Sequence, residues 1–461
     1  MLVIPAHIFR EYDIRGVAES DLQSPLIEQL GQGLAQLMAN AGRPPRIVVL
    51  RDCRTSGPRL RDALVAGLVK GGCQVMDIGV GPTPLMYFAV HHLTADGGVM
   101  ITGSHNPPAE NGFKLMKGVG PFFGQQIQEL RALIESGSLK AAATPGSLKE
   151  MNLDDAYLAK LKSAVTIANP TIAFAVDAGN GAAGPLGLRV LRELGCNPAA
   201  LYCEMDGNFP NHHPDPTVPE NLSALVAEVK RSGALMGLAW DGDGDRLGVV
   251  DKSGELIWGD RLLALFARRV LRTNPGATVI GDVKCSQSLF DDVNAHGGTG
   301  LMWKTGHSLI KQKMKEQHAL LAGEMSGHFF FADRYFGYDD GIYAALRMLE
   351  IVAETGKSPA ELLLDLPKGH STPEIRVPCP DALKFQVVDA VKQHFRGKVT
   401  LSEIDGVRMN YDDGSWGLVR ASNTGPLLVL RCEAGSEQRL TALRQEVEAA
   451  VSSAKQQLGA M

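Results

Sequence analysis

The sequence predicts an α/β protein with three similar α/β domains, each built on a mixed sheet, and a smaller C-terminal α+β domain. Two repeated patterns indicate this class. An apolar strand closed by an aspartate occurs three times, ending at Asp52, Asp177 and Asp282, and a small or polar loop and a helical pattern follow each one. Apolar strands alternate with helices until about Ser371, where strands with one exposed face begin.

The first unit opens with a charged segment. Residues 8–16, IFREYDIRG, predict a first strand at a solvated edge. Beyond it, the apolar run at 46–52 predicts a strand, and the proline-initiated pattern at 58–71 predicts a helix. Short apolar runs at 74–79 and 99–101 predict two further strands. This order of elements is typical of a βαβ layer.

Each of the three units also has a strand that enters a glycine-rich polar loop and leaves as another apolar strand. The loops are TGSHNP at 102–107, DGDGDR at 241–246 and GEMSGH at 323–328. Each unit therefore presents one polar loop. The domain boundaries that we expect are 1–150, 151–252 and 253–370 for the three units with polar loops and 371–461 for the C-terminal domain.

The last domain differs in its pattern. Its expected strands are 374–377, 398–404, 416–420 and 427–430, and its expected helices are 382–395 and 438–458. One polar loop, RASNTGP at 420–426, joins two of these strands. It combines a guanidinium, two hydroxyls and an amide beside a glycine, which are the groups of an anion clamp.

Composition excludes several classes of function. The chain has 461 residues and a formal net charge of −5, so it lacks the basic excess of a nucleic-acid-binding protein. Its seven cysteines form no CxxC pair, which is typical of reduced thiols in the cytoplasm. Arg10 and Glu11 interrupt the N-terminal apolar stretch, so no signal-peptide core is expected there. No apolar run approaches the roughly 20 residues of a membrane span.

Ser104 is the candidate nucleophile. A buried strand precedes it, Gly103 allows a ligand close to the backbone, and Thr102, His105 and Asn106 supply polar groups around its hydroxyl. A serine-hydrolase elbow is excluded, because it needs glycines two residues before and after the serine. Taken alone, the loop also fits a turn serine that caps local backbone.

DGDGDR is the most specific chemical pattern in the chain. Its carboxylates at Asp241, Asp243 and Asp245 lie between two apolar runs, where uncompensated like charges are costly. A hard divalent cation resolves this repulsion, and three oxygens that leave room for a phosphate suit Mg²⁺. The alternative is a solvated acidic turn. An EF-hand is excluded, because Arg246 and Lys252 stand where that loop needs glycine and glutamate.

Two weaker motifs complete the set. GEMSGH places Glu324, Ser326 and His328 in one loop, a mixture that suits sugar hydroxyls but also fits incidental polar residues. WKTGHS places His307 at a strand-to-helix junction, where most histidines cap or pack. No Walker A motif exists, since Ile351 occupies the first glycine position before the only GKS.

TGSHNP, DGDGDR, GEMSGH and RASNTGP, in this order over essentially the whole chain, resemble the α-D-phosphohexomutase superfamily, and the methionine of GEMSGH resembles its phosphomannomutase/phosphoglucomutase branch. The resemblance implies four domains around a central cleft: a phosphoserine-loop domain at 1–150, a metal-binding-loop domain at 151–252, a sugar-binding-loop domain at 253–370 and a phosphate-binding lid domain at 371–461. It also implies the following roles: Ser104 as the phosphoserine; Asp241, Asp243 and Asp245 with that phosphate as Mg²⁺ ligands; Arg15, Lys114 and His307 at the reacting hydroxyl; Glu324, Ser326 and His328 at the sugar; Arg420, Ser422, Asn423 and Thr424 at the non-reacting phosphate; and Tyr12, Arg246 and Lys284 along the cleft.

The implied reaction is reversible phosphoryl transfer between the 1- and 6-positions of mannose or glucose phosphates through a hexose 1,6-bisphosphate. Lys114 or His307 would act as general base. Gly425 departs from the family pattern, in which a larger residue often precedes the proline. A phosphoglucosamine mutase, which usually has glutamine at Met325, and a non-catalytic sugar-phosphate-binding protein are the alternatives. A cytoplasmic monomer without nucleic-acid or membrane partners is expected.

Overall fold

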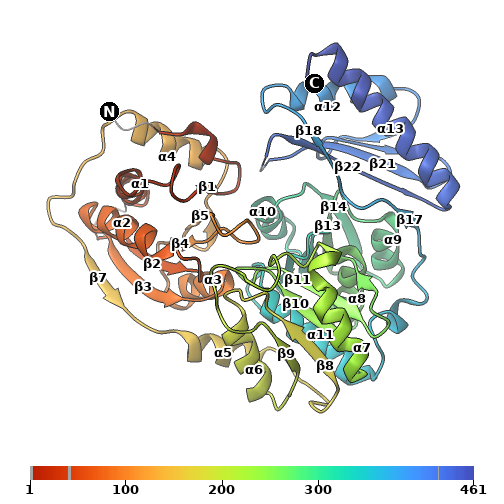
Figure 1. Cartoon of the computed structure of the whole chain (residues 1–461), viewed down its shortest axis with the longest axis horizontal. Helices are drawn as coiled ribbons and strands as arrows, with labels where there is room; N and C mark the ends of the chain where they lie inside the picture. Colours follow the sequence, from red (N-terminus) through yellow and green to blue (C-terminus); the bar gives the residue numbers. More distant parts are fainter. Residues whose placement is uncertain (1–3, 40–42, 424, 461) are drawn as a thin grey trace.

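The computed structural model describes residues 4–39, 43–423 and 425–460, and their strands form four separate sheets (Figure 1). Three of these sheets mix parallel and antiparallel pairs, and the fourth, near the C-terminus, is antiparallel throughout. The prediction of three mixed-sheet α/β domains and a C-terminal α+β domain is confirmed.

The first sheet has the order β1-β5-β4-β2-β3-β7, with β6 paired to β5. Its interior strand β2 is apolar between two arginines, and helix α2 begins with Gly57 and Pro58, as the sequence predicts. The elements are η1 (Ala6–Ile8), β1 (Ile14–Val17), α1 (Ser24–Leu37), β2 (Arg46–Arg51), α2 (Gly57–Lys70), β3 (Gln74–Val80), α3 (Thr83–His92), β4 (Gly97–Ile101), β5 (Glu110–Lys117), β6 (Gly120–Pro121), α4 (Gln125–Glu135) and β7 (Ser147–Glu150).

The expected strand at 8–16 is wrong over most of its length. Residues Ala6–Ile8 form a 3₁₀ helix, and only Ile14–Val17 pair as an edge strand, against β5. Phe9 and Ile14 form an antiparallel bridge, and the backbone N–H of Arg10 donates to the carbonyl of Asp13 at 3.0 Å. The chain therefore turns between Phe9 and Ile14, and this turn carries Tyr12 toward the other domains.

The second and third sheets have the orders β12-β11-β10-β8-β9 and β14-β13-β15-β16. In the second domain the elements are α5 (Asp154–Ser163), β8 (Phe174–Asp177), α6 (Gly184–Glu193), β9 (Ala199–Leu201), η2 (Pro219–Leu222), α7 (Ser223–Ser232), β10 (Met236–Trp240), β11 (Leu247–Asp251) and β12 (Leu256–Ile257). In the third they are α8 (Gly259–Leu271), β13 (Thr278–Asp282), α9 (Gln287–Ala295), β14 (Thr299–Trp303), α10 (His307–Gln317), β15 (Leu321–Gly323), β16 (Phe329–Phe331), α11 (Gly341–Thr355) and η3 (Glu361–Leu363).

The three polar loops occupy the same place in the three sheets. Each lies at the turn where a strand pairs antiparallel with the next one, between β4 and β5, between β10 and β11, and between β15 and β16. The sequence repeat therefore reflects a structural repeat, and each domain offers one polar loop from an equivalent position.

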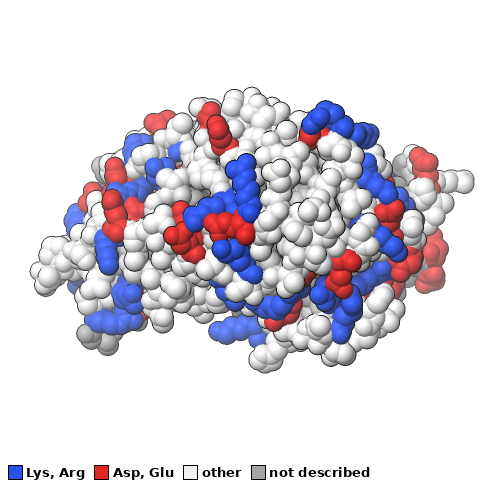
Figure 2. Space-filling view, turned by 90° about the horizontal axis from the view of Figure 1, so that it is seen from below, with Lys and Arg blue, Asp and Glu red and all other residues white. Residues whose placement is uncertain are grey.

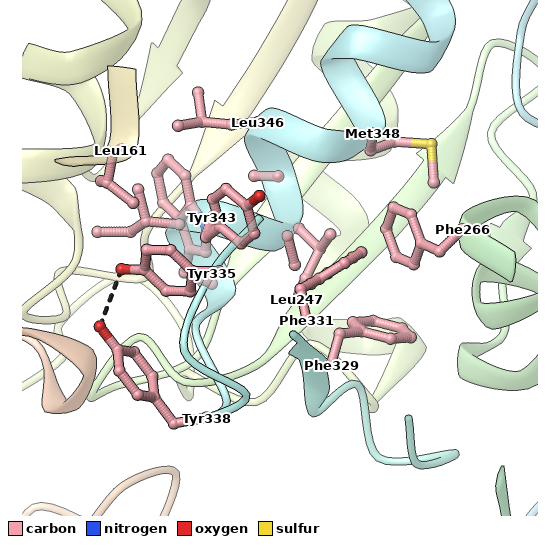
Figure 3. Close-up of a cluster of buried hydrophobic side chains, with 14 of the residues drawn as sticks. Leu161, Leu247, Phe266, Phe329, Phe331, Tyr335, Tyr338, Tyr343, Leu346 and Met348 are labelled. Atoms are coloured by element: carbon pink, nitrogen blue, oxygen red, sulfur yellow. Dashed lines mark hydrogen bonds between the residues drawn. The ribbon is translucent and has the colours of Figure 1, made fainter. Parts of the chain in front are cut away.

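One continuous hydrophobic core extends over the second and third domains and includes part of the first. In Figure 3 the ring of Phe266 in α8 meets that of Phe331 in β16, with centroids 5.1 Å apart, and Tyr335 stacks on Tyr343 at 4.2 Å. Tyr335 also accepts a hydrogen bond from Tyr338 at 3.0 Å. These rings all belong to the third domain, and Tyr338 also packs against Tyr87 of the first domain, with centroids 5.3 Å apart, so the core continues across this domain boundary.

The C-terminal domain has its own core between an antiparallel sheet and helices α12 and α13, and it forms the upper right part of Figure 1. The sequence analysis missed strands β17 and β20, which are short. The elements are β17 (His370–Ser371), β18 (Ile375–Pro378), α12 (Lys384–Phe395), β19 (Thr400–Ser402), β20 (Val407–Asn410), β21 (Trp416–Ala421), β22 (Leu427–Ala434) and α13 (Glu437–Gln457).

Charges of both signs are intermixed on the face shown in Figure 2. All seven cysteines carry free thiols, and five of them are buried. Within the described residues, every helix is too short or too polar to cross a lipid bilayer.

Candidate active site

A cavity of about 790 Å³ brings together most of the residues that the sequence analysis selected. Residues from the first, second, third and C-terminal domains line it, so it forms only when all four are assembled. Thr424 lies outside the described residues, and the three aspartates lie beneath the cavity wall. The lining includes Tyr12, Arg15, Ser104, Lys114, Arg246, Lys284, His307, Glu324, Ser326, His328, Arg420, Ser422 and Asn423.

Ser104 lies at the floor of this cavity, in the loop between β4 and β5. It is 2% exposed, and its backbone adopts a left-handed conformation with φ of 50°. Its hydroxyl donates a hydrogen bond to Asp241 Oδ2 at 2.8 Å and lies 3.1 Å from His105 Nδ1. The predicted nucleophile of the first domain therefore touches the predicted metal loop of the second.

The aspartates of DGDGDR form a buried carboxylate triad. Asp241, Asp243 and Asp245 are all 0% exposed, and they offer ligand oxygens within 4.8 Å of one another. One oxygen of Asp243 and one of Asp245 have no hydrogen-bond partner among the described residues. Three carboxylates with unpartnered oxygens fit a hard divalent cation, so this cluster can bind a metal ion. Burial and the two neighbouring aspartates raise the pKa of Asp241 well above its ordinary value.

Gly242 allows the two loops to meet. A Cβ on this residue would lie 2.4 Å from the carbonyl oxygen of Ser104, which is closer than side chains approach backbone. The glycine at position 242 is therefore required by the close contact between the two loops.

Lys114, from strand β5, places its ammonium group against the carboxylate triad at the floor of the cavity. Its Nζ lies 2.7 Å from Asp243 Oδ2 and also contacts Asp245, while Thr83 donates to Asp243. Burial would lower the pKa of Lys114, but the aspartates outweigh burial and raise it. Lys114 is therefore a firmly held cation beside the carboxylate triad.

Two histidines of the third domain lie one above the other. The rings of His307 and His328 stack with centroids 5.8 Å apart and an interplanar angle of 20°. His328 Nε2 accepts from Arg246 Nε at 3.0 Å, so its Nδ1 carries the proton and donates to Asp339 at 3.2 Å. Burial lowers the pKa of His307 well below its ordinary value, which keeps its ring neutral.

Asp339 is a site residue that the sequence analysis missed. Besides His328, it accepts a hydrogen bond from Lys311 at 2.9 Å and lies 3.9 Å from His307 Nδ1. Its signal in the sequence is a pair of adjacent acids, Asp339 and Asp340, shortly after the GEMSGH loop. Nearby, Glu324 Oε1 accepts from the backbone of Gly306 at 2.6 Å, and burial raises its pKa.

The polar loop that follows β21 in the C-terminal domain is joined to two other domains. Arg420 Nε donates to Asp405 Oδ2 at 2.8 Å, and Asp405 also accepts from the backbone of Thr305 at 3.1 Å. Tyr12 donates to the Thr305 carbonyl at 2.8 Å and accepts from Asn423 at 2.5 Å. Asp405 was missed because nothing in its local sequence indicates a partner.

Further cations line the remaining walls. Arg15 donates to Asn106 Oδ1 at 3.0 Å and to Asp13 at 2.6 Å, and Lys284 lies 3.2 Å from Glu374. At Gly425, a Cβ would meet only Leu427 Cδ2 at 3.7 Å, so the fold tolerates a larger residue there.

A hydroxyl over a carboxylate triad, surrounded by cations from four domains, defines the class of phosphoryl-transfer enzymes. Four family models match this chain in order, and the chain belongs to the phosphoglucomutase/phosphomannomutase family. The matches are alpha/beta/alpha domain I over residues 6–141, domain II over 155–254, domain III over 258–369 and the C-terminal domain over 374–450.

Individual relatives agree with this assignment. A phosphomannomutase/phosphoglucomutase of Pseudomonas aeruginosa is 47% identical over 455 residues, which cover 98% of this chain and 97% of the relative. A phosphoglucomutase of Neisseria gonorrhoeae is 45% identical and covers 98% of both chains. A solved phosphoglucomutase/phosphomannomutase family protein of Burkholderia thailandensis superposes with a TM-score of 0.91 at 42% identity, covering 98% of each chain.

Proposed function

We propose that this protein is a phosphomannomutase/phosphoglucomutase, which moves a phosphoryl group between the 1- and 6-positions of mannose and glucose phosphates. The observation that carries the proposal is the 2.8 Å contact between the Ser104 hydroxyl and Asp241, at the floor of a cavity that also contains Arg420 of the C-terminal domain. Such a cavity offers one place for the reacting phosphate and another for the non-reacting one. The names of the relatives support the same activity.

In the proposed reaction, phosphorylated Ser104 gives its phosphoryl group to the free hydroxyl of a hexose phosphate. The bond between phosphorus and Ser104 Oγ breaks, and a bond to the sugar oxygen forms. Of the two candidate bases, Lys114 and His307, we propose that His307 takes the hydroxyl proton, because the aspartates raise the pKa of Lys114. The product is a hexose 1,6-bisphosphate. After this intermediate turns over in the cavity, its other phosphate returns to Ser104 and the proton is given back.

The chain's charged side chains stabilise this transfer. Arg15 and Lys114 offset the charge of the phosphoryl group beside Ser104. We propose Mg²⁺ as the ion held by Asp241, Asp243 and Asp245 together with the phosphate on Ser104; when bound, it supplies further positive charge to the phosphoryl oxygens.

The other lining residues bind substrate in this proposal. Arg420 and its neighbours hold the non-reacting phosphate, and the third domain contacts the sugar hydroxyls. The assigned groups are Arg420, Ser422, Asn423 and Thr424 for phosphate, Glu324, Ser326 and His328 for the sugar, and Tyr12, Arg246 and Lys284 for the walls. The domain boundaries, the monomeric state and a cytoplasmic location belong to the same proposal, the last because all seven cysteines are free.

A coupled assay tests this function. Purified protein with Mg²⁺ and a trace of bisphosphate should convert the 1-phosphates of mannose and glucose to the 6-phosphates, and Ser104→Ala should lose this activity by orders of magnitude while it folds normally. Intact-mass measurement should find one phosphate on the wild type and none on the variant. A preference for glucosamine 1-phosphate would assign a phosphoglucosamine mutase, and binding without turnover would assign a sugar-phosphate-binding protein.

A further inference from the structure

A buried guanidinium lies directly beneath the serine loop. Arg54 follows strand β2 and is 0% exposed. Its two terminal nitrogens donate to four backbone carbonyls of the loop: those of Ser104 at 2.7 Å, Asn106 at 2.6 Å, Pro107 at 2.6 Å and Glu110 at 2.9 Å. The planar fork of an arginine is suited to such a set of acceptors, whereas the three donors of a lysine are not.

The same guanidinium is also linked, through two other side chains, to the backbone N–H of Ser104. Arg54 Nε donates to Asp52 Oδ2 at 3.2 Å, and Asp52 accepts from the Thr102 hydroxyl at 2.7 Å. The Thr102 oxygen in turn accepts from the backbone N–H of Ser104 at 2.8 Å. Both the carbonyl and the amide of Ser104 are therefore held by one closed hydrogen-bond network.

This network restrains an unfavourable conformation. Ser104 has φ of 50°, in the left-handed region that residues with a side chain rarely adopt. The fit is tight, because a Cβ on the preceding Gly103 would lie 2.6 Å from Arg54 Cζ. The left-handed turn is what places the Ser104 hydroxyl 2.8 Å from Asp241.

A loop of the second domain covers the other side of Arg54. The ring of Phe209 packs on the guanidinium, with its centroid 5.1 Å from Cζ, and Phe209 itself has φ of 48°. Close by, a Cβ on Gly207 would lie 2.4 Å from the carbonyl oxygen of Cys53. The second domain therefore packs on Arg54 and also supplies Asp241, the acceptor of the Ser104 hydroxyl.

We propose that Arg54 is a positioning residue for phosphoryl transfer. Phe209 of the second domain holds the Arg54 guanidinium in place by packing on it at the interface with the first domain. Arg54 is inaccessible to substrate, so it acts through the conformation of Ser104. Its loss should slow the reaction without weakening the binding of sugar phosphate at the C-terminal clamp. The inference rests on the proposed mutase function.

The test compares Arg54→Lys with Arg347→Lys. Arg347 is a matched control, because it is 1% exposed and bonds Asp333 at 2.8 Å but does not contact the Ser104 loop. In Arg54→Lys we expect kcat for glucose 1-phosphate to fall about 100-fold, as a misplaced reacting group does, with KM within about threefold of wild type. Arg347→Lys should keep kcat. Hydrogen exchange should accelerate at the amides of 102–110 in Arg54→Lys alone.

Three outcomes would overturn the proposal: a folded Arg54→Lys protein with wild-type kcat, a parallel loss of kcat in both variants that follows their folded fraction, or unchanged exchange at the loop. If Arg54→Lys does not fold, Phe209→Leu tests the proposal instead. The proposal then requires that Phe209→Leu lower kcat and leave KM unchanged. Hydrogen exchange at the Ser104 loop can be measured without turnover. It therefore tests whether Arg54 holds this loop even if the wild type has no mutase activity.

Discussion

The ammonium group of Lys114 lies 2.7 Å from Oδ2 of Asp243. One partner belongs to a strand of the first domain and the other to the carboxylate triad of the second. Burial alone would raise the pKa of Asp243, but the ion pair and hydrogen bond with Lys114 outweigh it and lower that pKa. Asp243 is therefore an anion in the folded protein, ready to serve as a ligand for a cation.

Replacing Asp243 with asparagine should weaken the binding of Mg²⁺. The change removes one of three anionic ligands, so the concentration of Mg²⁺ that gives half-maximal activity should rise roughly tenfold or more, since affinity follows ligand charge. Binding of sugar phosphate, measured by calorimetry, should change little. Asp251→Asn is the control, because Asp251 is buried at the end of β11 outside the triad. Equal Mg²⁺ requirements in both variants would show that the triad has only a structural role.

The rate of turnover should depend on pH through a histidine. A general base must be neutral to accept a proton, so activity falls as pH drops through its pKa. Burial lowers the pKa of His307 below its ordinary value of 6.5, and the acid limb of kcat should therefore have its midpoint below pH 6.5. His307→Asn and His328→Asn, measured separately, should show which ring produces this limb. A midpoint at or above pH 6.5 would contradict His307 as the base.

The clamp should serve both half-reactions. Arg420→Ala should raise KM for glucose 1-phosphate and glucose 6-phosphate alike, by about ten- to a hundredfold, because a charged hydrogen bond to phosphate is lost. It should also release more bisphosphate before the intermediate reorients. Arg439→Ala is a control in the same domain, since Arg439 pairs with Asp413 on the surface.

The C-terminal domain should close on substrate. Its separate core and its polar contacts to Tyr12 through Asn423 are suited to a mobile lid. Small-angle scattering should therefore show compaction when substrate is added to the wild type. A constant radius of gyration, together with an Arg420→Ala effect on only one phosphosugar, would rule out the lid.

Stability should depend on pH through Asp340. Burial raises the pKa of this carboxyl from 3.8 to about 6, although it accepts hydrogen bonds from Tyr157 and Tyr335. The folded state therefore binds the proton more tightly than the unfolded state. The resulting stabilisation is complete below pH 3.8 and is lost as pH rises through about 6.

Asp340→Asn cannot ionise, so it should gain stability relative to the wild type as pH increases across this range, by up to about 3 kcal/mol. Urea unfolding at several pH values measures the difference. A difference that stays constant with pH would mean that Asp340 does not titrate between the two values.

Local sequence determined a large part of this structure. The alternation of apolar strands and helices, the three loops at equivalent turns and the change of pattern near Ser371 all reflect burial and turn chemistry within a few residues. The same local patterns selected Ser104 and the DGDGDR aspartates. The strand expected at 8–16 failed because the chain reverses between Phe9 and Ile14, and residues 10–13 contain neither the glycine nor the proline that usually marks a turn.

Only the tertiary structure decided which side chains meet. Arg54 beneath Ser104, Asp339 beside His328 and Asp405 beside Arg420 are contacts that no motif indicated, and Tyr12 meets Asn423 from the opposite end of the chain. The physical reason is that these pairs depend on how loops and domains dock. Many apolar contacts spread over the shared core fix how the domains dock. The local sequence around a site residue therefore does not reveal which residue of another domain it will contact.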